Sequence, residues 1–548
     1  MTVSIQPGDD VRKLRVAVFL FVSGCALWYA LVSQCAWEDW YITYRASRNL
    51  ALGHGLSFTE GQHIYSFTSP VGTLLPALLC FLTSGNDDLV LWLFRLIAAG
   101  LLGASGVLLL GCLRELHYRL AAIVVLLGLF ALDSKIIGFS ISGMETAFVI
   151  ACLAFMLHTL TVPSGRPVLR LGLTLGAIMW TRPDGFIYWG ALVLGFLLFG
   201  SPNTLARSRG GFVRACLQAV GIALLVYAPW FFWTWSYYGS PVPNTIIAKG
   251  LHDTSLLQRL AAYPRLVFGF GMDETFLPPY AGARYWTALE ILVPTFKPLL
   301  LIGLFYWLWQ RGQPAARAAS FAFLCGHFYL AVIVPYAWPW YYPSIEILAF
   351  VVFAAAVQDV LDRIAGAVGR SKTAWSLPLA VPAITLAMQA AVFVCAAYEW
   401  RIQHRVIELG NRMQIGLWLK RNASTPNDTV MLECLGYIGF YSNLKTYDFP
   451  GMSSPEMVAA RRKLGTDNWA PLIRELRPDW LVMRPMEIGV VQRQNPTLLQ
   501  TDYELANVFD VSKQVAAYAW LPGRNTLQAD QTFLVLHRKT VTGVAADR

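Results

Sequence analysis

Long apolar stretches separated by short polar segments dominate roughly the first 400 residues of the chain. A helix needs about 20 mostly apolar residues to cross a bilayer core, with about 17 as the lower limit. On this rule the pattern predicts about 11 membrane-spanning helices. They cover residues 16–32, 89–113, 120–132, 144–160, 169–180, 186–198, 215–233, 288–308, 318–334, 345–360 and 377–396. The third, fifth and sixth are short for a span, so hydropathy alone leaves them open.

Charge in the connecting segments supports the short spans and predicts the orientation. Alternate connections are basic, and together they contain Arg12, Lys13, Arg15, Arg114, Arg119, Arg166, Arg170, Arg207, Arg209, Arg214, Arg311, Arg317, Arg363, Arg370 and Lys372. Cytoplasmic connections of membrane proteins carry the excess of lysine and arginine. We therefore expect the N-terminus in the cytoplasm, and an odd number of spans then places the C-terminal part outside.

The N-terminal segment also resembles a signal peptide, because basic residues precede an apolar run, and Val22–Cys25 resembles a lipoprotein processing site. In a signal peptide the apolar region ends at the cleavage site. Here it continues past Cys25 to Val32. The pattern favours an uncleaved first helix.

From about residue 399 the chain is no longer continuously apolar and is typical of a small α/β domain. Strands are expected at 429–433, 478–483 and 532–537, and helices at 407–421 and 454–464. The fold class predicted is mostly α. It combines a polytopic helical bundle over residues 1–398 with a soluble extracytoplasmic α/β domain over residues 399–548.

Two of the outward connections, 34–88 and 236–286, are too long to be simple connectors. The first contains the apolar piece 70–82, which is too short to span and is expected to form an interfacial helix. Long ordered loops on one face of a protein usually build a site. We therefore look for functional residues in these two connections.

Composition supports a membrane protein: 56% of the 548 residues are hydrophobic, 14% are aromatic and 14% are charged. Soluble domains carry about 25% charged residues. These values exclude a disordered chain and an ordinary cytosolic enzyme. The net charge of +10 is explained by the basic connections, so no nucleic acid is expected as a partner.

Common cofactor and metal motifs are absent from the sequence. The nine cysteines are scattered without a C-x-x-C pair, and the histidines form no ligand cluster. A Walker loop, a dinucleotide fingerprint and an H-E-x-x-H motif are also missing. No cofactor is required, although a divalent cation beside the acidic residues stays open.

An acid pair, Glu38 and Asp39, lies between tryptophans directly after the first span. Burial against aromatic rings raises the pKa of a carboxylate towards the value that a general base needs. A solvated pair beneath an aromatic belt is the alternative, and both interpretations stay open. Arg45 and Arg48 follow on one helical face, either as counter-ions or as ligands of an anionic head group.

Further charged and aromatic residues lie near the same predicted face. Arg182 and Asp184 occupy a turn between two short spans. They are either functional residues or an ion pair in which each charge only compensates the other. Glu145 begins the fourth span, where helix capping is the alternative role. Lys249 follows a Pro-Asn-Thr turn and suits a phosphate or a lipid head group. The Trp340–Tyr341 pair suits a sugar ring or an aromatic belt.

Taken in order, these segments resemble a known family. The motifs are Glu38–Arg45, Asn49–Leu56, Thr68–Pro70, Gly143–Thr146, Arg182–Gly185, Pro243–Lys249, Gly436–Gly439 and Tyr447–Met452. The series resembles the polytopic GT-C glycosyltransferases, especially the terminal arabinofuranosyltransferases that build bacterial cell-wall arabinan. The resemblance covers most of the chain.

Two departures from that family are visible. The acid pair is Glu-Asp where Asp-Asp is common, which favours Asp39 as the essential acid. A late segment that reads Gly-Gly-Asp-x-Met-x-x-Arg in close arabinofuranosyltransferases is absent, and Trp338–Pro343 stands in roughly its place. The class is unaffected, whereas the sugar and the acceptor stay open.

The resemblance implies transfer of a sugar from a polyprenyl-phosphate donor, with inversion at the anomeric carbon. It implies Asp39 as general base with Glu38 beside it, and cations that bind the departing phosphate. The implied donor- or substrate-binding set is Arg45, Arg48, His54, Glu145, Arg182, Asp184, Asn244, Lys249, Trp340 and Tyr341.

The implied acceptor is a cell-envelope glycan or glycoprotein, and the implied location is the bacterial cytoplasmic membrane, where the bundle contacts lipid. Two rival functions stay open. One is a ligase that moves a whole lipid-linked glycan. The other is a transporter or flippase, for which inverted repeats and charges at mid-membrane are expected.

Overall fold

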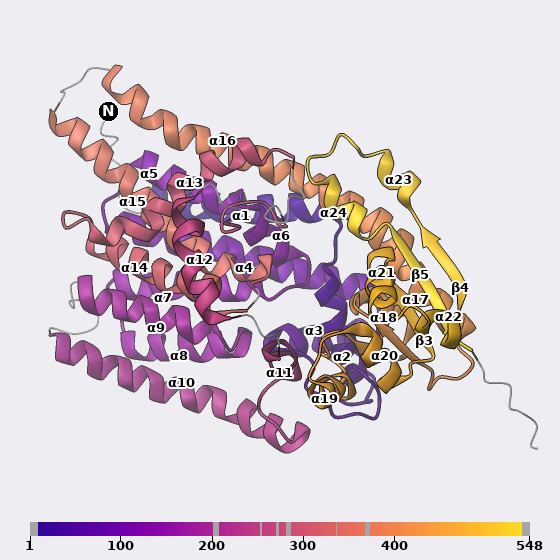
Figure 1. Ribbon diagram of the computed structural model, residues 1–548. Coiled ribbons are helices and arrows are strands. Elements are labelled where there is room, and N and C mark those ends of the chain that lie inside the picture. Colours follow the sequence, from indigo (N-terminus) through magenta and orange to yellow (C-terminus); the bar gives the residue numbers. More distant parts are fainter. Residues whose placement is uncertain are drawn as a thin grey trace, which may run out of the picture.

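A computed structural model describes residues 9–200, 208–251, 255–269, 273–280, 287–335, 337–367 and 373–539. Long helices pack side by side in one body, and a smaller domain of strands and short helices lies at one end of them (Figure 1). The predicted fold class, a helical membrane bundle with a C-terminal α/β domain, is confirmed.

Each predicted span coincides with a helix. These are α1 (Asp9–Ser33), α4 (Asp87–Glu115), α5 (Leu120–Ala131), α7 (Thr146–Thr161), α8 (Pro167–Thr181), α9 (Gly185–Phe199), α10 (Arg209–Tyr238), α13 (Leu289–Phe305), α14 (Pro314–Phe328), α15 (Pro343–Ala367) and α16 (Thr373–Ile402). In the described part of the chain, 7 helices are long and apolar enough to cross a membrane, or 8 if α5 and the bent α6 (Ser134–Ile141) form one span. Helices α7, α8 and α9 are apolar but shorter, so the number of spans stays a prediction.

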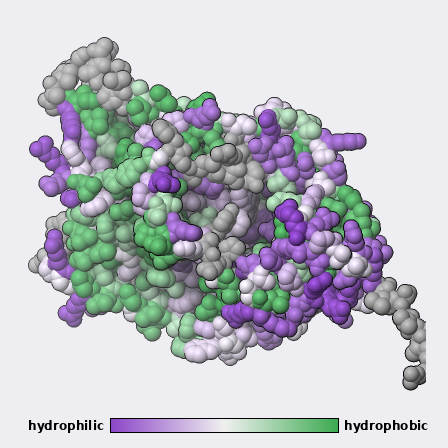
Figure 2. Space-filling model, viewed as in Figure 1, coloured by the Kyte–Doolittle hydropathy of each residue, from purple (hydrophilic) through white to green (hydrophobic). Residues whose placement is uncertain are grey.

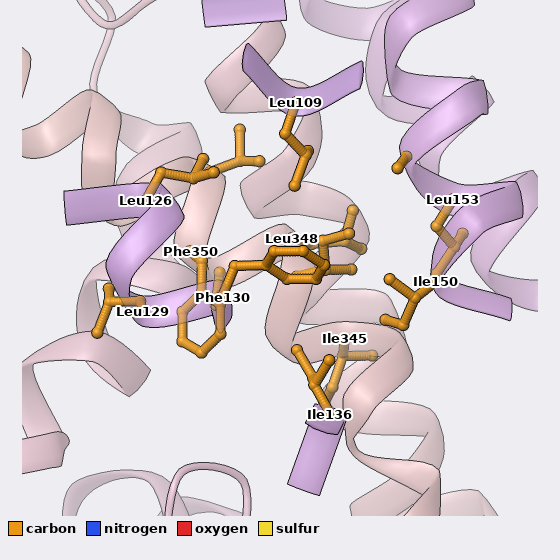
Figure 3. Packing of buried hydrophobic residues seen from close by; sticks show 14 of the residues in the cluster. Leu109, Leu126, Leu129, Phe130, Ile136, Ile150, Leu153, Ile345, Leu348 and Phe350 are labelled. Atoms are coloured by element: carbon orange, nitrogen blue, oxygen red, sulfur yellow. The ribbon is translucent and has the colours of Figure 1, made fainter. Parts of the chain in front are cut away.

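The bundle is held together by interdigitated aliphatic and aromatic side chains and by small residues at close crossings. Figure 3 shows Phe130 of α5, Ile150 of α7 and Leu348 of α15 converging at its centre. At Gly195 of α9 an added Cβ would lie 2.5 Å from the carbonyl oxygen of Ala318 in α14. Only glycine allows these backbones to approach so closely, as is typical of helices packed within membranes.

Basic connections gather at the end of the bundle remote from the α/β domain. Arg119 lies 2.8 Å from Asp362, and the guanidinium of Arg363 lies 4.4 Å from the ring centre of Trp309. The α/β domain lies at the other end (Figure 1). Figure 2 shows apolar side chains covering the bundle and hydrophilic side chains covering the α/β domain. The basic connections and the α/β domain thus lie at opposite ends of the bundle, as the positive-inside rule predicts if the domain is outside the cytoplasm. The orientation itself stays a prediction.

A fusion experiment tests the orientation. A reporter that is active only in the cytoplasm should be silent when fused after Arg548, and active when fused after Phe199, where a cytoplasmic connection is expected. Strong activity of the C-terminal fusion would contradict the predicted orientation of the bundle.

Short helices lie at the end of the bundle that faces the α/β domain: α2 (Glu38–Ala51), α3 (Pro70–Leu82), α11 (Asn244–Gly250) and η5 (Pro339–Tyr341). Helix α12 (Leu256–Phe268) instead packs against the segment Tyr329–Ile333, where its Arg259 donates to the Val332 carbonyl. Helix α3 begins where the Ser69 hydroxyl accepts a hydrogen bond from the Gly72 N–H and Pro70 occupies the first turn. It has 13 residues, too few to span, and it leaves Phe81 and Leu82 exposed. This apolar face is consistent with the expected interfacial helix.

The α/β domain contains a five-stranded sheet in the order β2-β1-β3-β5-β4. Its strands are β1 (Thr429–Leu432), β2 (Lys445–Asp448), β3 (Trp480–Met483), β4 (Tyr503–Asp510) and β5 (Thr532–Arg538). Strands β2, β1 and β3 are parallel, whereas β5 is antiparallel to both β3 and β4. The three predicted strands are confirmed. The sequence missed β2, which is short and polar, and β4, an edge strand that is mostly exposed.

Helices surround this sheet and connect it to the bundle. Helix α16 continues through η6 (Gln403–Arg412) into α17 (Met413–Asn422), as expected for a helix near 407–421. The others are α18 (Gly436–Ser442), α19 (Pro455–Leu464), α20 (Trp469–Leu476), α21 (Pro485–Gln494), α22 (Leu498–Asp502), α23 (Ser512–Ala516) and α24 (Arg524–Ala529). Segments that follow β1 and β2 contact α2 and α11 of the membrane part. The carboxyl ends of the parallel strands, where ligands of α/β sheets bind, therefore face the bundle.

Candidate active site between the bundle and the α/β domain

The two adjacent carboxylates at the start of α2 have different surroundings. Glu38 accepts a hydrogen bond from Arg412 Nη1 at 2.8 Å and another from the Gly436 N–H at 3.3 Å. Among the described residues, no group donates a hydrogen bond to the carboxylate of Asp39, which is half-buried. Glu38 therefore joins α2 to the α/β domain, and the side chain of Asp39 is available for a ligand.

The electrostatic surroundings of Asp39 suit a base. Burial raises the pKa of Asp39 to about 6, while the ammonium group of Lys249 acts in the opposite sense and Glu145 and Glu433 raise it further. A carboxylate with this pKa is ionised at neutral pH and is a better proton acceptor than an exposed aspartate. Burial also raises the pKa of Glu38, against the effect of Arg412.

Arg182 is the centre of a second group of charges, in the turn between α8 and α9. Its Nε and Nη2 atoms donate to the two carboxylate oxygens of Asp184, each at 3.0 Å. Its Nη1 lies 3.6 Å from Glu145 Oε1 and donates to the Trp340 carbonyl at 3.4 Å. Its guanidinium lies 4.5 Å from the ring centre of Tyr341. The turn is therefore joined to the start of α7 and to η5.

Lys249 connects this group to Asp39. Its Nζ lies 3.4 Å from the hydroxyl of Tyr341, and it interacts electrostatically with both Asp39 and Glu145. Segments that lie far apart in the sequence thus bring Lys249 and the ion pair of Arg182 and Asp184 to the ring of Tyr341. The charge of Lys249 also acts on Asp39, which accepts no hydrogen bond from the described residues. This set contains seven of the predicted residues: Asp39, Glu145, Arg182, Asp184, Lys249, Trp340 and Tyr341.

Four of the predicted binding residues make contacts away from this set, and their role in donor binding stays a prediction. Arg45 is buried and donates to the carbonyls of Gly439 and Leu444 in the α/β domain, at 2.7 and 3.2 Å. Asn244 Nδ2 donates to the carbonyls of Gly451 and Met452, at 2.7 and 3.1 Å.

The other two contact acidic side chains and are partly exposed. Arg48 lies 3.8 Å from Asp87, and the ring of His54 lies 3.2 Å from Glu60. None of the four residues has a contact with Asp39 or Lys249 among the described interactions, so we do not assign them to the donor site.

Two residues near Asp39 were missed in the sequence. Glu433 directly follows β1 and pairs with Arg484 at 2.8 Å. Tyr280 stacks on Trp37, with ring centres 5.9 Å apart, and its pKa is raised by burial and by the charge of Asp39. The position of Glu433 at the carboxyl end of a parallel strand is a signal that could have indicated a site residue. Tyr280 lies in a connecting segment whose sequence shows no motif or hydrophobic periodicity.

The acidic residues of the site are not gathered as metal ligands. In the ranges that the structure describes, no group of three His, Cys, Asp or Glu residues could hold a metal ion. Glu38, Glu145 and Asp184 each face an arginine instead. The possibility of a divalent cation therefore gains no support from the geometry.

Solved structures with a similar fold are membrane glycosyltransferases. The oligosaccharyltransferase of Archaeoglobus fulgidus matches with a TM-score of 0.51 and 13% identity, covering 90% of this chain and 73% of that one. ArnT of Cupriavidus metallidurans matches in its apo state with a TM-score of 0.52 and 14% identity, covering 95% and 97%. The chain thus has the GT-C fold that the motifs predicted.

Sequence similarity is limited to parts of the chain. Over 298 residues it is 26% identical to the terminal beta-(1->2)-arabinofuranosyltransferase of Corynebacterium glutamicum, a match that covers 49% of this chain and 39% of that relative. The matched region is well below two thirds of the relative's length. Residues 398–535 match a domain of unknown function, DUF8728.

Proposed function

We propose that this protein is an integral-membrane glycosyltransferase. It transfers a sugar, arabinofuranose or a related pentose, from a polyprenyl-phosphate donor to a cell-envelope glycan or protein acceptor. The reaction takes place on the outer face of the cytoplasmic membrane. The terminal arabinofuranosyltransferase relative supports the choice of sugar. A ligase that moves a lipid-linked glycan is the nearest alternative, since an oligosaccharyltransferase shares the fold.

One observation carries the proposal: an acid without a hydrogen-bond partner among the described residues, and a lysine whose charge lowers the pKa of that acid, lie where the bundle meets the α/β domain. Asp39 is half-buried, accepts no hydrogen bond from the described residues, and interacts electrostatically with Lys249. Transfer of a sugar from a phosphate needs both groups, because a base must accept a proton while a cation stabilises the leaving phosphate.

The chemistry follows from this pair. Asp39 accepts the proton of an acceptor hydroxyl, and the oxygen of that hydroxyl forms a bond to the anomeric carbon. The bond from this carbon to the phosphate oxygen breaks with its electron pair, so the leaving polyprenyl phosphate gains a negative charge, which Lys249 stabilises. Arg182 already faces two carboxylates. Its role is therefore to orient Tyr341 and Glu145 while Lys249 binds the phosphate.

A buried ionic cluster that the sequence did not indicate bears on the transporter alternative, for which charges at mid-membrane are expected. Lys135 lies 2.8 Å from Glu346, and Gln389 donates to Asp133 at 2.8 Å. The charged residues of this cluster are at most 2% exposed. Lys135 also donates to the Thr275 carbonyl at 2.7 Å. These contacts fasten an outer loop to the bundle, whereas an ion pathway requires charged groups with access to water.

Transfer by purified protein in detergent tests the proposed function. We expect turnover with a polyprenyl-phosphate pentose and none with the matching nucleotide sugar, because Lys249 suits a single phosphate and the sequence has no glycine-rich loop for a pyrophosphate. Efficient use of the nucleotide sugar in the absence of any lipid carrier would refute the proposed donor. Transfer of a whole lipid-linked oligosaccharide would favour the ligase.

The pH dependence of kcat/KM provides a second measurement. Since Asp39 must be ionised to accept a proton and its pKa is about 6, kcat/KM should fall about tenfold per pH unit below pH 6. In a Lys249→Ala variant the favourable positive charge is lost, so the pKa of Asp39 rises and the acidic limb moves to higher pH. An acidic limb that stays in place in this variant would mean that another group titrates.

A further inference from the structure

The helix that carries Lys249 is too short to be stable by itself. Helix α11 has 7 residues, and isolated helices shorter than about 12–15 residues are marginal in water. The orientation of Lys249 therefore depends on what holds α11 in place.

Both ends of α11 are held by the α/β domain. At its start, Asn244 Nδ2 donates to the carbonyls of Gly451 and Met452. At its end, Arg461 of α19 donates from Nη1 to the Ala248 carbonyl at 2.8 Å, one residue before Lys249. A hydrogen bond from a guanidinium to a carbonyl in the last turn also opposes the negative end of the helix dipole.

The groups that hold α11 are themselves rigidly placed. The side chain of Arg461 is 1% exposed, lies 2.6 Å from Asp467 and also donates to the Pro450 carbonyl at 2.9 Å. The loop that receives Asn244 is organised by Asp448, which accepts hydrogen bonds from the Ser453 N–H and hydroxyl at 2.9 and 2.7 Å.

We propose that Arg461 is a positioning residue of the donor-phosphate site, and that it acts through the Ala248 carbonyl by orienting Lys249 towards Asp39 and Tyr341. The α/β domain then forms part of the donor site without contacting the donor. This inference rests on the proposed function, because it assumes that Lys249 binds the phosphate.

A double-mutant cycle separates positioning from direct binding. We expect Lys249→Ala to raise the KM for the lipid-phosphate sugar roughly ten- to a hundredfold and Arg461→Ala to raise it about tenfold, with smaller changes in kcat. If Arg461 acts through Lys249, the double variant should match Lys249→Ala within about twofold. Additive effects would overturn the proposal, because they indicate that Arg461 binds the donor directly or supports the fold.

Conservative and control variants sharpen the cycle. Arg461→Lys keeps a cation near the Ala248 carbonyl and should recover part of the loss. Arg462→Ala removes an exposed arginine from the same helix and should leave the KM unchanged. Asn244→Ala tests the other end of α11 by the same cycle, and it replaces Arg461→Ala if that variant does not fold.

A measurement without substrate distinguishes failure of this inference from failure of the proposed function. The rate at which an amine-reactive reagent labels Lys249, followed by mass spectrometry, should increase in Arg461→Ala and stay unchanged in Arg462→Ala. If Lys249 is labelled at the same rate in all three proteins, Arg461 does not position it, whatever the protein transfers.

Discussion

Asp39→Asn should lower turnover by about two to four orders of magnitude while the protein still inserts and folds normally. Asparagine keeps the size of the side chain but cannot accept a proton from the acceptor hydroxyl. No described residue donates a hydrogen bond to the Asp39 carboxylate, so the substitution leaves no partner unsatisfied. Initial rates with a lipid-phosphate sugar, together with thermal unfolding of the purified protein, measure both effects.

The neighbouring acid is the matched control. Glu38→Gln retains an oxygen that can accept from Arg412 and from the Gly436 N–H, which bond to Glu38 at 2.8 and 3.3 Å. Its turnover should stay within about tenfold of the original, below the loss expected from removing a general base. If instead Glu38→Gln is inactive and Asp39→Asn retains activity, the roles of the two acids are reversed. If both retain activity, Asp39 is not the general base.

Arg412→Met should lower the free energy of unfolding by about 3–5 kcal/mol, because removal of one partner leaves buried charges uncompensated. Arg412 has a side chain that is 5% exposed and lies within 2.9 Å of Glu38, Glu408 and Asp530. These contacts join the membrane part to the α/β domain. Denaturant unfolding in detergent measures the loss, and limited proteolysis shows whether the domain separates.

Two comparisons test this explanation. Arg421→Met changes an exposed arginine on α17 and should be nearly neutral. In Arg412→Met the carboxylates of Glu38 and Glu408 lose the cation that opposes the rise of their pKa values by burial, so the folded state binds protons more readily than the unfolded state. The stability deficit should therefore shrink as the pH falls below neutral. A deficit that is equal in both variants, or independent of pH, contradicts a role for the ionic contacts.

Hydropathy and charge predicted the helices because the bilayer leaves few alternatives. A backbone in lipid must satisfy its own hydrogen bonds, so an apolar run of sufficient length has to form a helix. This explains why α1, α4 and α15 were predicted correctly. The short α5, α8 and α9 were supported by the alternating basic connections. By contrast, β2 and β4 lack an apolar pattern and were missed.

Candidate residues were predicted by type, but their roles depended on contacts between distant segments. Arg45 and Arg48 belong to the same helical face, yet Arg45 is buried against the carbonyl of Gly439, 394 positions later. The sequence shows that an arginine is present but not which distant residue its guanidinium contacts. The buried pair of Lys135 and Glu346 was invisible for the same reason.

The sequence by itself determined the class of protein, the helices of the bundle and the set of charged residues from which the site is built. Tertiary structure alone decided which acid is available. Glu38 and Asp39 are adjacent and chemically alike, and they differ because Arg412, 374 positions away from Glu38, pairs with the first carboxylate. The second carboxylate accepts no hydrogen bond from the described residues, and the charge of Lys249 lowers its pKa against the effect of burial. Such a choice depends on the packing of the α/β domain against α2 and α11, since electrostatic pairing requires atoms to lie within a few ångströms of each other.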